Sequence, residues 1–194
     1  MRMLAAAAAG ALLLSSGAFA QTTVAGWTIG HDNNGDCQAA YSYKDAEDDN
    51  AENSVVISLV EEKGRKVPDV YVILAYEKWD WDKGEETKTE VLVDKKVYAS
   101  GHSWISPSKN LLISKFVNQL DRFVRAFAEG KKLTIRFTED DEEAEFNIPD
   151  VGQALGAVQY CQASGFILPS FAPARCGGAQ GPVARLIHVY LRPR

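Results

Sequence analysis

The sequence has few of the residues that carry metal and redox chemistry in proteins. Its 194 residues include three cysteines, three histidines and two methionines. No two cysteines form a C-x-x-C pair and the histidines are scattered, so we expect neither a bound metal nor a cofactor. The sequence also lacks a G-x-S-x-G motif, a common signature of serine hydrolases.

Basic charge is scarce over most of the chain. The sequence has 21 Lys and Arg against 26 Asp and Glu, with a formal net charge of −5. Every acidic residue lies between Asp32 and Asp150. Because nucleic-acid phosphates need a basic surface, this composition excludes nucleic acid as a partner but not a basic protein.

No apolar run in the chain is long enough to span a bilayer. A short one lies near the N-terminus, where Arg2 precedes the apolar stretch 4–14. Ala18-Phe19-Ala20 then places small residues three and one before a cleavage point, an order typical of a secretory signal peptide at 1–20. We therefore expect a secreted or periplasmic protein that begins at Gln21 and has no membrane span after cleavage.

The default use of cysteine in an exported protein is a disulfide bond. A bond between Cys37 and Cys161 would tie the first hairpin to the last helix, and is the pairing we favour. Closing so long a loop would stabilise the fold by about 4–5 kcal/mol. Cys161 with Cys176 is the competing pair, and one thiol stays unpaired in either case.

The first element after the signal peptide reads as a β-hairpin. Alternating apolar residues before and after the turn pair well only if the loop has an odd length, which sets Ile29 opposite Ala39. Such a loop of three or five residues would hold Gly35 in a left-handed conformation.

Several later segments also have strand character. The runs 55–60 and 70–76 are apolar at nearly every position, which indicates central strands buried on both faces. A second hairpin is expected over 90–99, and alternation predicts two more strands around 133–137 and 144–148. Together with the first hairpin, these segments predict a mostly antiparallel sheet of six to eight strands.

Two segments have helical periodicity. The main helix is expected over 115–128, where one apolar stripe is followed by Gly130 as a stop signal. The stripe consists of Phe116, Leu120, Phe123, Val124 and Phe127. A shorter helix after Pro149-Asp150 would turn five residues inward: Val151, Ala154, Leu155, Val158 and Cys161.

These elements predict a single α+β domain over 21–162. Its mostly antiparallel β-sheet or sandwich packs against one amphipathic helix, with a short C-terminal helix beside it. Beyond Gln162 the composition changes to four prolines, a glycine pair and no acidic residue. Residues 163–194 are therefore expected to be a weakly ordered basic extension.

A series of short motifs follows one another along 24–162. Trp27 precedes Cys37, and later strands end in the sequences 91–95 (VLVDK) and 146–148 (FNI). This layout resembles the small secreted bacterial proteins of the invasion-associated locus B type. That family tends to carry a Cys pair with a Gly before the helix, where this chain has 101–105 (GHSWI). The resemblance implies a periplasmic or surface protein of an alphaproteobacterium, connected with the envelope or a host and without known catalysis.

Exposed tryptophans are the strongest candidates for a binding site. Trp79 and Trp81 alternate with carboxylates at the end of a strand, and Trp104 is a third candidate. A tryptophan beside carboxylates suits sugar stacking or a protein hot spot, whereas a tryptophan that closes the end of a core has no such role.

Three other patterns in the sequence contain residues of the kind found in functional sites. The segment 31–36 (HDNNGD) matches a calcium loop poorly, because Gly30 and Tyr41 would stand where Asp and Glu belong, and a plain turn is expected. His102 and Ser103 adjoin, but neighbours on a strand point to opposite faces. The acidic run 139–143 is expected to be a solvated hairpin tip.

The sequence thus favours a non-enzymatic secreted protein that binds an envelope or host macromolecule, either protein or glycan. Two alternatives remain open. One is a periplasmic hydrolase of the cell wall, with His102 and nearby carboxylates in its site. The other is an inhibitor of a hydrolase, with the acidic tip 139–143 entering a basic cleft.

Overall fold

The computed structural model describes residues 21–32, 34–139 and 142–165. The predicted signal peptide at 1–20 and nearly all of the predicted extension at 163–194 therefore lie outside the described residues. None of the helices in the described part is long and apolar enough to cross a bilayer.

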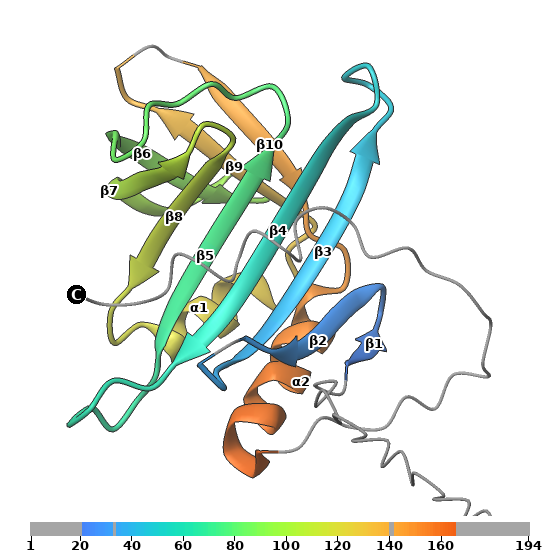
Figure 1. Cartoon of the computed structure of the whole chain (residues 1–194), viewed down its shortest axis with the longest axis vertical. Coiled ribbons are helices and arrows are strands. Elements are labelled where there is room, and N and C mark those ends of the chain that lie inside the picture. The colour runs from blue at the N-terminus through green and yellow to red at the C-terminus, as the bar shows by residue number, and fades with distance from the viewer. Residues whose placement is uncertain (1–20, 33, 140–141, 166–194) are drawn as a thin grey trace, which may run out of the picture.

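Ten strands form one antiparallel sheet in the order β1-β2-β3-β4-β5-β8-β7-β6-β9-β10 (Figure 1). The mostly antiparallel α+β class is thus confirmed, while the strand count exceeds the expected six to eight. The sheet is single and open, with β1 and β10 at its edges, so the structure does not confirm a sandwich. The strands are β1 Thr22–Val24, β2 Trp27–His31, β3 Cys37–Asp45, β4 Ala51–Val60, β5 Asp69–Tyr76, β6 Glu86–Val93, β7 Lys96–Ser108, β8 Leu111–Phe116, β9 Lys132–Phe137 and β10 Glu143–Asn147.

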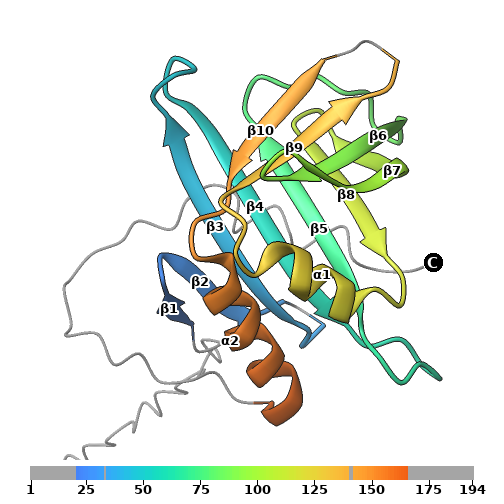
Figure 2. The same ribbon diagram turned by 180° about the vertical axis from the view of Figure 1, so that it is seen from behind.

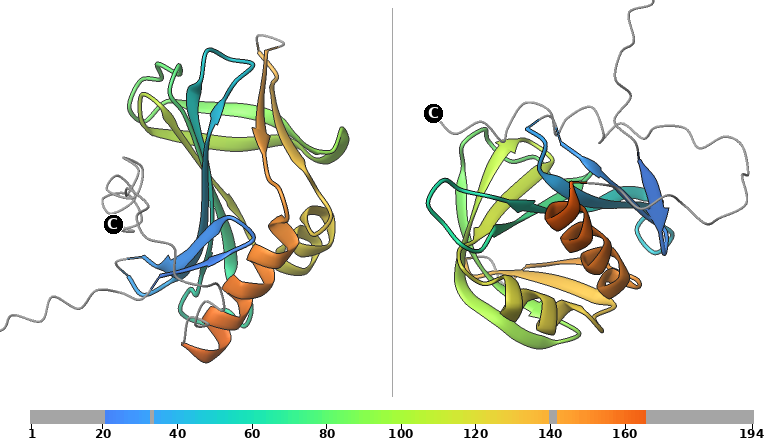
Figure 3. Two further views of the ribbon diagram at one scale, coloured as in Figure 1. Left: turned by 90° about the vertical axis from the view of Figure 1, so that its right-hand side faces the viewer. Right: turned by 90° about the horizontal axis from the view of Figure 1, so that it is seen from below.

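The sheet curls so that its last strands face its early ones across the core (Figure 3). Two long-range hydrogen bonds hold the curl. The backbone N–H of Asn147 donates to the Tyr43 hydroxyl at 2.8 Å, and the Trp27 indole N–H donates to the Pro149 carbonyl at 2.7 Å. The buried Trp27 side chain therefore joins the first strands to the end of the last hairpin.

The first hairpin has the register that its sequence predicts. Ile29 pairs with Ala39, and Gly35 has a φ of 88° in a five-residue loop. The predicted central strands are also confirmed, because β4 and β5 carry buried side chains on both faces. Val55 and Leu74 lie in the main core, and Val56 and Ile73 lie in a smaller apolar cluster on the other face.

The predicted main helix over 115–128 is wrong in its first five residues, 115–119. Residues Leu111–Phe116 form β8, which pairs along β5, and the helix α1 covers only Leu120–Phe127. The chain turns at Asn118, whose φ is 54° and whose backbone N–H donates to the buried Asp69 carboxylate. Phe116 fits both the apolar stripe of a helix and the last position of a strand. Periodicity alone therefore does not distinguish a helix from a strand at this point.

The second helix is longer than expected. α2 spans Val151–Ser164, fourteen residues against eight in α1, and passes the predicted domain end at Gln162. All five residues predicted to point inward are buried. Figure 2 shows both helices lying against the inner face of the sheet at one end of the molecule.

The favoured disulfide is confirmed: Cys37 at the start of β3 is bonded to Cys161 in α2, a sequence separation of 124 residues. Both cysteines are buried. The bond therefore fastens the last helix to the first long strand beneath the curled sheet.

Candidate functional site

Three acidic loops and one short turn meet at the end of the sheet opposite the helices, and we call this the acidic end (Figure 1). It consists of the β3–β4 turn 46–50, the β5–β6 loop 77–85, the β7–β8 turn 109–110 and the β9–β10 turn 138–142. These loops carry nine carboxylates against three lysines, not counting Asp140 and Asp141, which lie outside the described residues. The antiparallel order of the strands brings the loops together, although they are far apart in sequence.

Trp79 and Trp81 lie in the middle of the acidic end. Their rings are 6.1 Å apart between centroids and meet edge to face. Trp79 also contacts Phe146 of β10 at 5.7 Å, and Trp81 contacts Phe137 of β9 at 5.5 Å. Both residues are half-buried against the core, and their ring contacts bridge the early and late parts of the sheet.

The residues around the two tryptophans differ in what they offer a partner. Asp80, between them, is 85% exposed and forms only an exposed ion pair with Lys109 at 3.4 Å. The indole nitrogen of Trp81 is buried and has no hydrogen-bond partner. An unpaired buried N–H donor is costly in a folded protein, so the Trp81 indole nitrogen is an unfavourable feature of this end of the core.

The β3–β4 turn is fixed beside this surface by a small network. Asp48 accepts hydrogen bonds from the Lys78 ammonium, at 2.5 Å, and from the Tyr76 hydroxyl. These bonds, that of Lys78 first, hold the pKa of Asp48 below its usual range. The turn is therefore held against the end of β5 as an anion, while the neighbouring Asp49 stays 96% exposed.

Trp104, the third predicted binding residue, lies in the core. Its side chain is 2% exposed, and its indole N–H donates to the Thr89 hydroxyl at 2.9 Å. It offers no surface to a macromolecule, and we do not include it in the candidate site.

His102 and its surroundings do not assemble a catalytic group. The ring is half-buried and stacks on Phe116 with centroids 4.0 Å apart, and burial lowers its pKa. Its Nε2 lies 2.6 Å from the hydroxyl of Ser114, which is also 2.7 Å from the Ser103 carbonyl. Because a hydroxyl has one hydrogen, donation to Ser103 makes Ser114 the acceptor from His102. The hydroxyl proton of Ser114 is therefore used in a hydrogen bond that joins β8 to β7.

Asp32, Asn34 and Asp36, which the structure describes within the segment 31–36, are joined as in a turn. The Asp32 carboxylate accepts hydrogen bonds from the backbone N–H groups of Asn34 and Asp36. This use of its oxygen within the turn is typical of an Asx turn and needs no ion.

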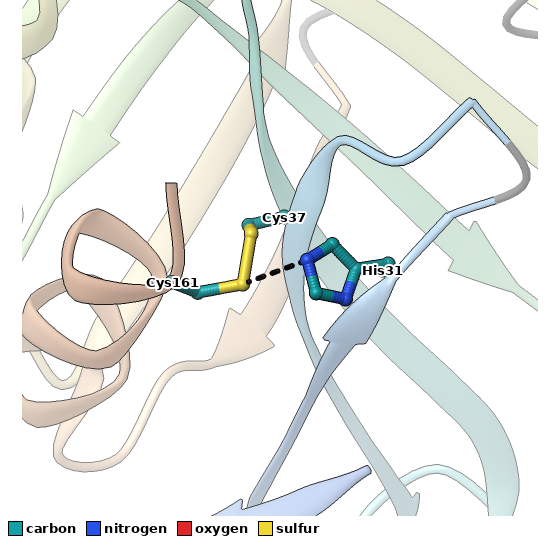
Figure 4. Close-up of side chains that lie close together, drawn as sticks. All are labelled: His31, Cys37 and Cys161. Carbon is teal, nitrogen blue, oxygen red and sulfur yellow. Dashed lines mark hydrogen bonds between the residues drawn. A yellow bond between two sulfur atoms is a disulfide. The ribbon is translucent and has the colours of Figure 1, made fainter. Parts of the chain in front are cut away.

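One group of three potential metal donors occurs in the part of the chain that the structure describes. His31, Cys37 and Cys161 place their donor atoms within 4.8 Å of one another, beneath the helix end of the sheet (Figure 4). The His31 Nε2 lies 3.5 Å from the Cys161 sulfur. In the oxidised protein the two sulfurs are bonded to each other, so their lone pairs belong to a disulfide.

No family model, curated protein or solved structure matches the chain. The resemblance to the invasion-associated locus B type therefore stays a prediction from sequence motifs.

Sequence reasoning found the two tryptophans and the acidic tip but not their proximity. Trp79 and Phe146 are far apart in the chain, and only the curl of the sheet brings their rings together. The alternation of Trp and Asp over 79–82 was the available signal, since it marks a segment with both a core-facing and a solvent-facing side.

Proposed function

We propose that this chain is an exported, non-enzymatic binding protein of the bacterial envelope or of the host interface. Its acidic end binds a basic surface on an envelope or host protein. The observation that carries this proposal is the position of Trp79 and Trp81 among three acidic loops. Aromatic anchors surrounded by charge are common in protein interfaces, where the rings supply affinity and the charges guide association.

Three features support this choice over a glycan ligand. The acidic loops surround the tryptophans on several sides, and neutral sugar stacking needs no such excess of charge. Trp79 and Trp81 meet edge to face and do not form a flat platform. Asp80, between the two tryptophans in sequence, is 85% exposed and so is open to a basic partner.

The proposal of export draws on the N-terminal sequence, on the Cys37–Cys161 disulfide and on the absence of a spanning helix among the described residues. Disulfides persist in oxidising compartments such as the periplasm. Within that setting, an inhibitor of a hydrolase is a special case of the same proposal. The β9–β10 tip, with Glu139 and Glu142 both exposed, would then enter a basic cleft of the enzyme.

The test uses charge reversal, because truncating a half-buried tryptophan also removes core contacts. Full-length protein is immobilised, partners are captured from an envelope extract and identified by mass, and the purified partner is titrated. We expect Asp80→Lys to weaken its binding at least about tenfold, and added salt to weaken binding to the unaltered protein as exposed charges are screened. Glu129→Lys, an equal charge change near the helices, is the matched control and should bind normally.

Binding that is insensitive to both Asp80→Lys and salt would contradict the proposal. A partner lost equally in Asp80→Lys and Glu129→Lys would show that net charge, and not the acidic end, drives the association.

A further inference from the structure

We propose that His31, Cys37 and Cys161 form a redox-gated site for a thiophilic ion, with Zn²⁺ as the expected occupant once the disulfide is reduced. The site lies at the helix end of the molecule, away from the acidic end. It therefore stands independently of the proposed binding function.

The fold brings the three side chains together from three elements. His31 ends β2 and pairs directly with Cys37 at the start of β3, so their side chains point to the same face of the sheet. Cys161 reaches the same point from α2, and Figure 4 shows the imidazole directed at its sulfur. The pairing of the strands thus positions two donors and the helix supplies the third.

The distance from His31 to Cys161 suits tetrahedral zinc. With bonds of about 2.3 Å to sulfur and 2.0–2.1 Å to nitrogen, neighbouring N and S ligands lie about 3.6 Å apart. The His31 Nε2 is already 3.5 Å from the Cys161 sulfur. After reduction the two sulfurs need to separate to about 3.8 Å, a change that rotation of the Cys side chains can supply.

The frame of the site does not depend on the disulfide alone. α2 is anchored by Leu155 and Val158, which are buried in the main core. The Gln162 side chain carbonyl also accepts a hydrogen bond from the Cys37 backbone N–H at 3.3 Å. Helix and strand therefore stay adjacent when the sulfur–sulfur bond is broken.

Two of the three donors are buried and the third is partly exposed. Cys37 and Cys161 are 1% and 0% exposed, whereas His31 is half-buried. An ion would enter beside the imidazole, where a water can take the fourth position. Two thiolates and an imidazole favour Zn²⁺ or Cu⁺ over Mg²⁺ and Ca²⁺, which prefer oxygen ligands.

The chemistry balances with a dithiol as reductant. The dithiol gives two electrons and two protons to the Cys37–Cys161 bond, yielding two thiols, and closes to its own disulfide. Zn²⁺ then displaces both thiol protons into solvent and is bound by two thiolates and the neutral His31 ring.

The test is a zinc titration of full-length protein carrying Cys176→Ser, so that only the two site thiols remain. The reduced protein, freed of reductant under anaerobic conditions, competes with a chromophoric chelator for Zn²⁺. We expect one Zn²⁺ per reduced chain and none per oxidised chain. His31→Ala should lower the affinity at least about tenfold by removing a ligand, and His102→Ala should match the parent.

Two results would overturn the proposal. One is zinc binding by the reduced parent that is no tighter than that of a Cys37→Ser/Cys161→Ser protein. The other is unchanged affinity in His31→Ala. If reduction unfolds the chain, circular dichroism should show that Zn²⁺ refolds the parent protein but not His31→Ala. Failure of Zn²⁺ to refold the parent would also overturn the proposal.

Discussion

The two ends of the curled sheet are built on different principles. At the helix end, residues more than a hundred positions apart are joined by a disulfide, by the Trp27–Pro149 hydrogen bond and by buried side chains of α2. At the acidic end, the surface consists of hairpin turns and loops with exposed charges, and the half-buried tryptophans are its main links to the core. Long-range burial holds one end together, and the other is left free to present charge.

This contrast predicts where substitutions will cost stability. Changes at the helix end should lower the free energy of unfolding strongly, whereas charge changes at the acidic end should affect binding and leave the fold intact. Three measurements test the difference.

Removing the disulfide should have the largest effect. Cys37→Ala/Cys161→Ala frees a loop of 124 residues in the unfolded chain, and we expect the free energy of unfolding to fall by about 4–5 kcal/mol. Urea unfolding with a metal chelator present measures this, with Cys176→Ala as the control. A loss below about 1 kcal/mol would mean that the packing of α2 alone holds this end.

The contact between the helices gives the next largest effect. A Cβ added at Gly152 would lie 2.3 Å from the Ala128 carbonyl oxygen, so Gly152→Ala must push α1 and α2 apart. We expect a loss of about 3 kcal/mol in urea unfolding, at the upper end for overpacking. Gly156→Ala on the same helix meets nothing within 4 Å and should stabilise by about 0.5–1 kcal/mol. Equal effects of the two changes would contradict the close contact.

An ion-pair network around the buried Asp69 at the helix end gives a smaller, pH-dependent effect. Asp69 is fully buried and contacts Arg65 at 2.5 Å and Lys115 at 3.1 Å. Burial alone would raise its pKa, but the Asn118 N–H and the two cations outweigh burial and hold the pKa below the ordinary 3.8. The resulting stability is therefore present at neutral pH and is lost as the pH falls below about 4 through the folded-state pKa.

We expect Asp69→Asn to cost about 2 kcal/mol at pH 7 and to flatten the acid limb of the stability curve. Urea unfolding at pH 7 and at pH 3 measures both. Lys109→Ala, which removes the exposed pair with Asp80 at the acidic end, is the control and should change stability by less than about 0.5 kcal/mol. If the cost of Asp69→Asn is the same at both pH values, the carboxylate is not the stabilising species.

Much of the sheet was predictable because alternation and apolar runs report directly on burial. The register of Ile29 with Ala39 followed from the need to keep apolar faces together. The same reasoning failed over 115–119, where Phe116 fits a strand and a helix equally well. The decisive feature there is the bond between Asn118 and Asp69, which is a tertiary contact and leaves no local pattern.

The candidate site was predictable in its residues but not in its assembly. Trp79 and Trp81 stand out in the sequence, yet their contacts with Phe146 and Phe137 depend on how far the sheet curls. Trp104 also stands out in the sequence but lies in the core, where its indole N–H donates to the Thr89 hydroxyl of the neighbouring strand. The donor trio was hidden for a related reason, because His31 meets Cys161 only through the packing of α2 on the first hairpin.

The long sequence separation between Cys37 and Cys161 also determines the order of events during folding. A chain that emerges N-terminus first presents Cys37 long before its partner, with 123 residues between them. During that interval the first hairpin carries a bare thiol and an uncovered apolar face. Once Cys161 has been synthesised, Cys176 follows only 15 positions later. Cys176 is thus much nearer to Cys161 in sequence than Cys37 is, and competes with Cys37 for the disulfide. Formation of the Cys37–Cys161 disulfide therefore requires α2 to pack against the sheet before Cys161 reacts. The packing of the last helix thus determines which disulfide forms.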